Sequence, residues 1–475
     1  MVQRSTRWLS LLVWGLSAVM AVASLEASEP ASRPNIVLIM ADDLGWKDLH
    51  CYGNAALDTP ALDRLAAEGV RFTDGYAAAP VCTPTRAAVM TGLSPARLRI
   101  TNHAPGNGEG FHLPGSTLQE AAWHSFLPLE QVTLAERLRE AGYATAFLGK
   151  WHLSHRKGHD ALGRFEPQLR PEHQGFDLNL GGCDFGGPPS YFAPYRLPNL
   201  DAKEEGEYLP DRLADEAIAF VREQPAGKPF FVCWWNYSVH YPFQAPDELI
   251  AKYRDREKAG NDNPTYSAMI EGMDRAIGRL LAELDARGLT HNTLVVFTSD
   301  NGPFAADVQP LRGEKGYLYE GGIRVPWIVR WPRGVAGNRV SEVPVISTDL
   351  FPTLLDAAGV ERDADETCDG VDLMPMLRGE ATLPPRVLTF HYPNYAFHKQ
   401  NRLGSAIRRG DYKLIHFYDD DSVELYDLRH DLSETTNLAD SLPAVAADLR
   451  TALTQQLTAE GANLPTWLPT AERQP

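Results

Sequence analysis

Apolar and polar positions alternate between strand and helix patterns over the first four-fifths of the chain. Residues 35–40, "NIVLIM", form a continuous apolar run, as expected for a strand buried on both faces of a parallel sheet. Further strands are predicted at 144–149, 230–239, 293–299 and 325–330, and helices at 62–69, 133–142, 211–223, 265–287 and 348–358. This order predicts an α/β fold with a large, mostly parallel sheet sandwiched by helices.

The pattern changes near residue 385. Two short strands around an acidic turn at Asp419–Asp421 predict an antiparallel hairpin, and a closing helix is expected over 441–459. We therefore divide the chain into a large domain over 33–380 and a smaller α+β subdomain over 385–475. Residues 155–210 are rich in Gly, Pro and aromatic side chains and lack periodicity, which predicts a long loop region of the kind that often shapes a binding site.

The N-terminus has the pattern of an export signal. Arg4 and Arg7 precede the apolar stretch "WLSLLVWGLSAVMAVA", and small residues at Ala21, Ala23 or Ala27 offer cleavage sites. A signal peptide over 1–27 predicts a periplasmic or secreted protein, with an uncleaved membrane anchor as the alternative. No other stretch is long and apolar enough to cross a bilayer, so we expect no stable membrane insertion.

Charge and cysteine content narrow the function. The 475 residues carry a net charge of −17, which argues against a nucleic-acid partner. An anionic substrate would have to be bound by a few local cations acting against the overall field. The five cysteines are Cys51, Cys82, Cys183, Cys233 and Cys368, so at least one of them forms no disulfide within the chain. The sequence does not indicate how the others pair, and their spacing is not that of a zinc site.

Polar residues directly follow two of the predicted buried strands. Asp42 and Asp43 follow the first strand, and Asp300 and Asn301 follow the strand at 293–299. Ligands of open α/β sheets bind outside the carboxyl ends of the strands. Three carboxylates and an amide oxygen there form a hard ligand set suited to Ca²⁺ or Mg²⁺. Helix caps and turns are the alternative role for such residues.

Four basic residues follow other strands or lie in a flexible loop. Lys150 and His152 end the strand at 144–149 and, two positions apart, point the same way. His240 follows the strand at 230–239, and Lys315 lies in the glycine-rich stretch "LRGEKGYLYEGG". Each also has an ordinary structural interpretation, as a hydrogen-bonded histidine or a surface lysine.

Cys82 lies at the start of a predicted short helix in "APVCTPTRAAVMTG". Pro84 suits a first helical turn, and Gly92 suits the helix end. A helix N-terminus favours an anion, and Arg86 is one turn further along. This places Cys82 at an anion site beside a cation, with an ordinary buried or disulfide-bonded cysteine as the alternative.

The stretch "CTPTRAAVMTG" resembles the signature of the type I sulfatases, relatives of the arylsulfatases in the alkaline phosphatase superfamily. Further stretches match that family in order: "NIVLIMADDLG", "LDTPALDRLAAEGVRFTDGYA", "GYATAFLGKWHL", "FTSDNG", "KGYLYEGGIRVP" and the tail "GDYKLI…ELYDL". Thr85 stands where the family usually has serine, and Met90 where it usually has leucine. The cysteine, proline and arginine of the signature are intact.

The resemblance implies a sulfuric ester hydrolase with an alkaline phosphatase-like fold. A separate formylglycine-generating enzyme would convert Cys82 to formylglycine, whose hydrate attacks sulfur with one hydroxyl and expels sulfate by deprotonation of the other. Arg86 would hold the hydrate, Lys150 and Lys315 would bind sulfate oxygens, His152 would be the base, and His240 the general acid with help from Lys315. One Ca²⁺ would be bound by Asp42, Asp43, Asp300, Asn301 and the modified Cys82.

The substrate is expected to be a terminal sulfated sugar. Export is one reason, and the segment 155–200 is the other, because it follows the strand that ends at Lys150. It offers aromatic side chains for sugar rings (Phe185, Tyr191 and Phe192) and polar ones for hydroxyls (Arg156, His173, Asp177 and Asp184). The alternatives are a structural lid for this segment and, for the whole chain, a broad arylsulfatase, a phosphatase or phosphodiesterase of the same superfamily, or an inactive binding protein.

Overall fold

The computed structural model describes Met1 and residues 33–107, 110–154, 167–256, 263–363, 365–397 and 401–469. The predicted signal peptide and Arg156 lie outside these ranges, apart from Met1. Within them, no helix combines the length and the apolar character that a membrane crossing requires.

An eight-stranded mixed sheet forms the centre of the fold, as the sequence predicts. Its order is β10-β2-β9-β8-β1-β7-β5-β6. The strands are β1 (Asn35–Ala41), β2 (Val70–Phe72), β5 (Ala144–Gly149), β6 (Leu178–Leu180), β7 (Phe230–Trp235), β8 (Thr293–Ser299), β9 (Trp327–Arg330) and β10 (Arg339–Ser341). β1 runs parallel to both of its neighbours, β7 and β8, and every residue of these three strands is buried. β9 is antiparallel to β8 and β2, so the sheet is mostly but not wholly parallel.

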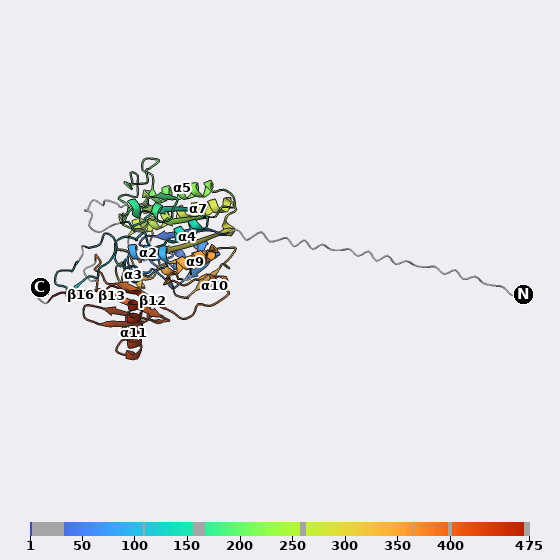
Figure 1. Cartoon of the computed structure of the whole chain (residues 1–475). Helices are drawn as coiled ribbons and strands as arrows, with labels where there is room; N and C mark the ends of the chain where they lie inside the picture. The colour runs from blue at the N-terminus through green and yellow to red at the C-terminus, as the bar shows by residue number, and fades with distance from the viewer. Residues whose placement is uncertain are drawn as a thin grey trace. The chain divides into compact units, whose positions relative to one another are not determined.

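Helices cover both faces of this sheet, because successive side chains of a strand point to opposite faces. Val37 and Ile39 of β1 face one core, which includes side chains of α1, α5 and α7. Leu38 and Met40 face the other core, which includes side chains of α2, α4 and α9. Figure 1 shows α5 and α7 grouped apart from α2, α4 and α9.

The helix bounds follow local signals in the sequence. Thr133 and Glu136 form a reciprocal capping box at the start of α4, as predicted, and Asn263 caps the long helix α7. The helices are α1 (Pro60–Glu68), α2 (Cys82–Thr91), α3 (Pro95–Leu98), α4 (Leu134–Glu140), α5 (Leu209–Glu223), α6 (Asp247–Arg254), α7 (Pro264–Ala286), α8 (Glu320–Ile323), α9 (Leu350–Ala357), α10 (Met374–Arg378) and α11 (Pro443–Glu460).

A smaller antiparallel sheet follows near the C-terminus. Its strands are β12 (Val387–Tyr392), β13 (Gly404–Arg409), β14 (Tyr412–Phe417) and β15 (Val423–Asp427), paired in chain order. α11 packs on one face through an apolar cluster, and a second cluster joins this sheet to α2. Both sheets belong to one compact unit that begins at Arg33, and the proposed domain boundary falls between α10 and β12. Two short pairs complete the strands, β3 (Gly75–Tyr76) with β11 (Val345–Ile346) and β4 (Leu118–Gln119) with β16 (Thr466–Trp467).

Three sequence predictions need correction. The strand expected over 230–239 ends at Trp235, because the chain then turns across the end of β1, where the amide of Asn236 bonds to the carbonyl of Met40. The hairpin around Asp419–Asp421 is present as β14 and β15, but it is part of a four-strand meander from β12 to β15, in which Gly410 turns the chain between β13 and β14 with a positive φ of 61°. The stretch 155–210 also contains a short strand, β6, that its sequence does not reveal.

Candidate active site

The carboxyl edge of the central sheet brings the ten predicted site residues together. They come from the ends of β1 (Asp42, Asp43), β8 (Asp300, Asn301) and β5 (Lys150, His152), from the loop after β7 (His240), from the first turns of α2 (Cys82, Arg86) and from the loop before α8 (Lys315). Elements that are distant in the sequence meet here because the parallel strands all end at this edge.

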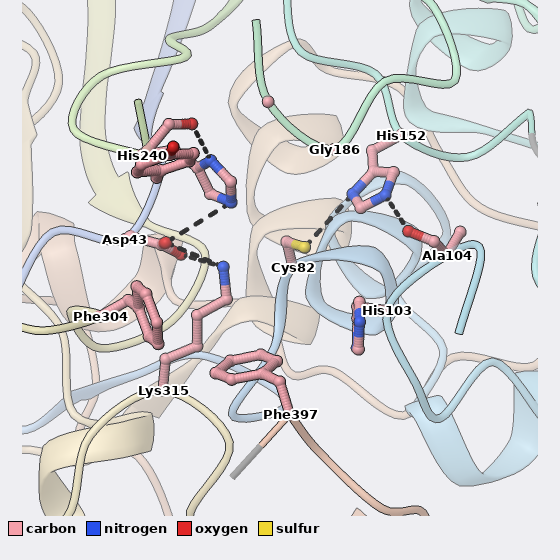
Figure 2. A pocket seen from close by; sticks show the side chains of 12 residues that line it. Asp43, Cys82, His103, Ala104, His152, Gly186, His240, Phe304, Lys315 and Phe397 are labelled. Carbon is pink, nitrogen blue, oxygen red and sulfur yellow. Dashed lines mark hydrogen bonds and ion pairs between the residues drawn. The ribbon is translucent and has the colours of Figure 1, made fainter. Parts of the chain in front are cut away.

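A pocket of about 360 Å³ opens at this edge (Figure 2). Five of the predicted residues line it: Asp43, Cys82, His152, His240 and Lys315. The other five have exposed fractions of 0 % and contact the lining residues from below the surface. A volume near the lower end of the range for small-molecule sites suits one compact ligand.

Three buried carboxylates and three buried cations pair beneath and beside the pocket. Nζ of Lys150 donates to both oxygens of Asp42, at 2.9 and 2.8 Å. Nζ of Lys315 lies 2.6 and 2.8 Å from the oxygens of Asp43. Arg86 donates through Nε and Nη2 to Oδ2 of Asp300, at 3.0 and 2.6 Å, and through Nη1 to the carbonyl of Lys150. The charges of the six groups therefore balance.

The two adjacent carboxylates titrate in opposite directions. Burial raises the pKa of Asp42 well above its ordinary value, although Lys150 opposes that shift. Burial would also raise the pKa of Asp43, but Lys315 and His240 outweigh it and hold that pKa below its ordinary value. Asp43 is thus the carboxylate that keeps its charge most firmly.

The side chain of Asn301 leaves an open oxygen acceptor in this cluster. Its Nδ2 donates to Oδ1 of Asp43 at 2.7 Å and to the carbonyl of Gly302 at 2.8 Å. Its Oδ1 is buried and accepts no hydrogen bond from any residue that the structure describes. Asp42, Asp43 and His240 also offer ligand atoms within 4.8 Å of one another. A buried amide oxygen beside carboxylates fits a hard cation, which prefers oxygen ligands.

His152 points one ring nitrogen at Cys82 and the other at a backbone carbonyl. Its Nε2 lies 2.5 Å from the carbonyl oxygen of Ala104, which only accepts, so Nε2 carries the proton. Its Nδ1 lies 3.2 Å from Sγ of Cys82 (Figure 2). Burial, followed by the charge of Lys150, lowers the pKa of His152 well below its ordinary value. The neutral ring therefore presents a lone pair on Nδ1 to the side chain at position 82.

The ring of His240 has the opposite tautomer, with the proton on Nδ1. Its Nδ1 donates to the carbonyl of Tyr241 at 2.7 Å, and its Nε2 lies 3.7 Å from Oδ2 of Asp43. Burial and the charge of Lys315 lower the pKa of His240 to about 3. The pKa of Lys315 is raised despite burial, chiefly by Asp43. Of these two neighbours, Lys315 holds the proton at neutral pH.

Comparison with known proteins identifies this arrangement. Residues 34–360 match the family described as Sulfatase, and residues 313–462 match the family described as N-sulphoglucosamine sulphohydrolase, C-terminal. The chain belongs to the sulfatase family. It is therefore an enzyme that hydrolyses sulfate esters.

Several sulfatases are similar over most of this chain. Human arylsulfatase A is 35% identical, over 90% of this chain and 87% of that protein. Steryl-sulfatase of Mus musculus is 35% identical, over 81% of this chain and 72% of that protein. Among solved structures, Ps i-CgsB in complex with k-i-k-neocarrahexaose has a TM-score of 0.75 and 29% identity, covering 93% of this chain and 96% of that one.

The pocket of this sulfatase includes residues that the sequence did not single out. They are His103, Ala104, Gly186, Gly187, Tyr241, Phe304 and Phe397. Two sequence features could have indicated pocket residues here. His103 lies in a glycine-rich loop shortly after α3, and Phe397 follows the strand β12. The glycines let the loop approach closely, because a Cβ at Gly187 would lie 2.6 Å from Nδ1 of His240 and one at Gly186 3.0 Å from the His152 ring.

The side chains predicted to hold a sugar within 155–200 need correction. Tyr191 is fully buried and its hydroxyl donates to the carbonyl of His240 at 2.9 Å, so it supports the His240 loop. Asp177 accepts from the amide of Thr145 and pairs with Arg139. Phe185 and Phe192 pack against the core, and neither they nor His173 and Asp184 line the pocket. Of its described part, residues 167–200, Gly186 and Gly187 line the pocket.

Proposed function

We propose that this sulfatase carries formylglycine at position 82, binds one Ca²⁺, and removes sulfate from terminal residues of sulfated carbohydrates. The observation that carries the proposal is the alignment of His152 Nδ1 with the side chain of Cys82, 3.2 Å away, at the wall of a small pocket ringed by Asp43 and Lys315. A formylglycine hydrate at that position would have this base within reach of a hydroxyl.

Asp42, Asp43, Asp300 and Asn301 would hold the cation, with the modified side chain at position 82. When bound, Ca²⁺ draws charge from the sulfate oxygens and acidifies a nearby hydroxyl. The open acceptor on Asn301 and the oxygen-rich set support this choice of ion. His240 offers a nitrogen in the same cluster, but its Nδ1 is committed to Tyr241 and its Nε2 faces Asp43.

The residues around position 82 then have distinct tasks. Hydrated formylglycine supplies two hydroxyls on one carbon, one to attack sulfur and one to be deprotonated as sulfate leaves. His152 accepts that second proton at Nδ1, because its Nε2 proton is tied to Ala104. Arg86 is anchored on Asp300 and directs fixed positive charge toward the start of α2. Lys150 and Lys315 each carry three donor hydrogens, enough to bind a carboxylate and a sulfate oxygen together.

Protonation of the leaving alcohol falls to the Lys315–His240 pair. His240 is neutral and Lys315 is protonated at neutral pH, for the reasons given above. We assign the role of general acid to His240 with help from Lys315, because Nε2 of His240 and Nζ of Lys315 both lie at the carboxylate of Asp43 on the pocket wall.

The shape of the pocket supports a terminal sugar as the substrate. A pocket of about 360 Å³ accommodates one ring rather than a polymer segment. Tyr241 and Phe397 are 64 % and 45 % exposed, and they give its entrance flat apolar faces, to which the apolar face of a sugar binds. The related Ps i-CgsB is solved with k-i-k-neocarrahexaose, which favours a saccharide here too.

The same aromatic entrance supports a second candidate, a broad arylsulfatase. The test compares kcat/KM for sulfated monosaccharides and disaccharides with kcat/KM for a nitrophenyl sulfate, using protein matured to formylglycine. We expect at least one sugar to exceed the aryl sulfate, because remote contacts raise turnover of the full substrate. If the aryl sulfate exceeds every sugar, the carbohydrate assignment fails and the arylsulfatase assignment stands.

Export and maturation complete the proposal. We propose cleavage within the N-terminal 27 residues and release to the periplasm or medium, after a formylglycine-generating enzyme has acted on Cys82. N-terminal sequencing of protein from the native host should begin after Ala21, Ala23 or Ala27. Recovery of intact Met1 in membranes would instead support an anchored form.

A further inference from the structure

His103 lies in the pocket wall, on the same side as His152 and Ala104 and opposite Asp43 and His240 (Figure 2). Its ring is held by Asn102, a residue with an exposed fraction of 0 %. Oδ1 of Asn102 lies 3.0 Å from Nδ1 of His103, and it also accepts from the backbone amide of His103 at 2.9 Å. The ring is thus fixed by its neighbour in sequence.

The contacts of Asn102 determine which ring nitrogen of His103 carries the proton. Nδ2 of Asn102 donates to the carbonyl of Tyr395, which sets the orientation of the amide. Oδ1 therefore faces His103, where a backbone N–H and the hydroxyl of Tyr392 also donate to it. Because an amide oxygen only accepts, Nδ1 of His103 is the protonated nitrogen and Nε2 is an acceptor.

The surroundings keep His103 in this neutral, accepting form. Burial, followed by the charges of Lys315 and Lys150, lowers its pKa to about 4. Among the residues that the structure describes, none hydrogen-bonds Nε2. A lone pair beside the reacting centre is therefore available to a ligand that donates.

Two phenylalanine rings adjoin this acceptor. The ring of Phe397 meets His103 edge to face with centroids 5.6 Å apart, and Phe304 meets Phe397 at 5.2 Å and 89°. Phe304 and Phe397 come from different loops, and both line the pocket. An acceptor next to an aromatic surface matches a ring that has hydroxyls on its rim and an apolar face.

We infer that His103 is a specificity-determining residue that accepts, at Nε2, a hydrogen bond from a substrate hydroxyl near the sulfate ester, while Phe397 contacts the apolar face of the same ring. The inference rests on the proposed carbohydrate function and names His103 as a residue that recognises the carbohydrate. A nitrophenyl or steryl sulfate has no hydroxyl beside the ester, so it would leave a desolvated acceptor unpaired. Sites built to bind a hydroxyl reject analogues that lack it for this reason.

The experiment pairs a variant with a change in substrate. His103→Leu removes the acceptor and keeps an apolar side chain of similar bulk. Wild type and variant are assayed on a sulfated monosaccharide that the wild type accepts, on its analogues lacking single hydroxyls next to the sulfate-bearing carbon, and on nitrophenyl sulfate. His124→Leu, at an exposed histidine outside the pocket, is the matched control. Thermal unfolding of each protein shows whether it folds.

For one deoxy analogue, we expect wild-type kcat/KM to fall about 10- to 100-fold, the effect of one lost hydrogen bond. His103→Leu should lower kcat/KM for the parent sugar by a similar factor. The variant should turn over the deoxy analogue about as well as it turns over the parent sugar. Its loss of kcat/KM on nitrophenyl sulfate should be at least tenfold smaller than its loss on the parent sugar. Equal losses of His103→Leu on sugar and aryl sulfate would overturn the inference while leaving the carbohydrate function intact. Failure of wild type on every sulfated sugar would overturn the function itself.

If His103→Leu does not fold, His103→Asn provides the second test. Its amide can still donate to Oδ1 of Asn102 in place of Nδ1, but the side chain ends short of the position of Nε2. The same hydroxyl-dependent loss is expected. If His103→Asn discriminates between the sugar and its deoxy analogue as strongly as the wild type does, the inference is overturned.

Discussion

Two buried clusters in this sulfatase have the same charge balance and different chemistry. The active-site cluster pairs Asp42, Asp43 and Asp300 with Arg86, Lys150 and Lys315. The C-terminal cluster pairs Asp74, Glu320 and Glu434 with Arg324, Arg408 and Lys413. All twelve side chains are largely buried. Three carboxylates against three cations therefore do not by themselves mark a catalytic site.

The difference lies in what surrounds the paired charges. In the C-terminal cluster, Glu320 accepts from Arg324, Lys413 and the hydroxyl of Tyr76, and Glu434 accepts from Lys413 and the amide of Glu320. In the active-site cluster, the buried Oδ1 of Asn301 has no donor among the described residues, and Asp43 and Lys315 reach an open pocket. A buried acceptor beside a cavity distinguishes a site for a ligand from a structural ion network.

The two clusters share one segment of chain, which links stability to catalysis. The loop before α8 carries Lys315, and Arg312 at its start donates to the carbonyl of Glu434 and the hydroxyl of Tyr426 in the C-terminal sheet. Glu320, five residues after Lys315, belongs to the C-terminal cluster. The small sheet thus holds both ends of the loop that delivers a lysine to the pocket.

The largest expected effect is a loss of activity when Cys82, beside the active-site cluster, is replaced. Cys82→Ala should lower kcat for any sulfate ester by about 10³-fold or more, since the nucleophile is lost while the binding groups remain. The melting temperature should change by only a few degrees, because the side chain becomes smaller within an intact helix. Cys51→Ala, at a half-buried cysteine outside the pocket, is the control and should keep its activity. Wild-type turnover by Cys82→Ala would contradict the assignment of the nucleophile.

The next effect is a loss of stability when the C-terminal cluster loses one of its carboxylates. Glu320→Gln removes one charge and leaves Lys413 and Arg324 short of a partner, so the free energy of unfolding should fall by about 3–5 kcal/mol. Chemical denaturation measures this loss. Glu283→Gln breaks the surface pair with Arg222, whose side chain is 62% exposed, and should change the free energy of unfolding far less than Glu320→Gln does, because water screens this pair. Equal effects of the two substitutions would show that the C-terminal cluster is not an essential ion network.

His391 is a buried titratable group without a charged partner among the residues that the structure describes, and it provides a third case. His391 of β12 is held between Ser405 and the carbonyl of Asn463, and burial lowers its pKa from 6.5 to about 4. Because the folded pKa is the lower one, its stabilising contribution is complete above pH 6.5 and is lost as the pH falls through 4. The loss amounts to about 3 kcal/mol between those values.

The measurement is the free energy of unfolding between pH 7 and 4. His391→Gln should flatten the fall by that amount, whereas His173→Gln, at an exposed histidine, should leave the fall as in wild type. An unchanged pH dependence in His391→Gln would contradict the role of this histidine.

The smallest effect tests the Ca²⁺ that we propose is bound by the active-site cluster. Added Ca²⁺ should stabilise the native protein by about 2.7 kcal/mol at a hundred times its Kd, measured as a rise in melting temperature. Asn301→Leu should lose most of this rise, and Glu283→Gln should keep it. A full response in Asn301→Leu, or a response to Zn²⁺ and none to Ca²⁺, would contradict the oxygen-ligand site.

The sequence predicts the parts of this site that lie at strand ends. Asp42, Asp300 and Lys150 each follow a buried strand, and parallel strands bring their carboxyl ends to one edge. Tyr191 was misassigned, because an aromatic residue in an aperiodic segment has no pattern that separates a core side chain from a ligand contact. His103 and Phe397 could not be placed together, since loops nearly three hundred residues apart meet only through tertiary packing.

The most direct test of the account is the chemical state of residue 82 in active enzyme. Trypsin should release residues 72–86, "FTDGYAAAPVCTPTR", as one peptide. We predict that mass spectrometry of active protein finds this peptide without its sulfur and two of its hydrogens and with one oxygen gained, as the aldehyde, or with one further water as the hydrate. The modified fraction should rise in step with specific activity across preparations. Fully active protein whose peptide retains an intact cysteine would contradict the proposed mechanism.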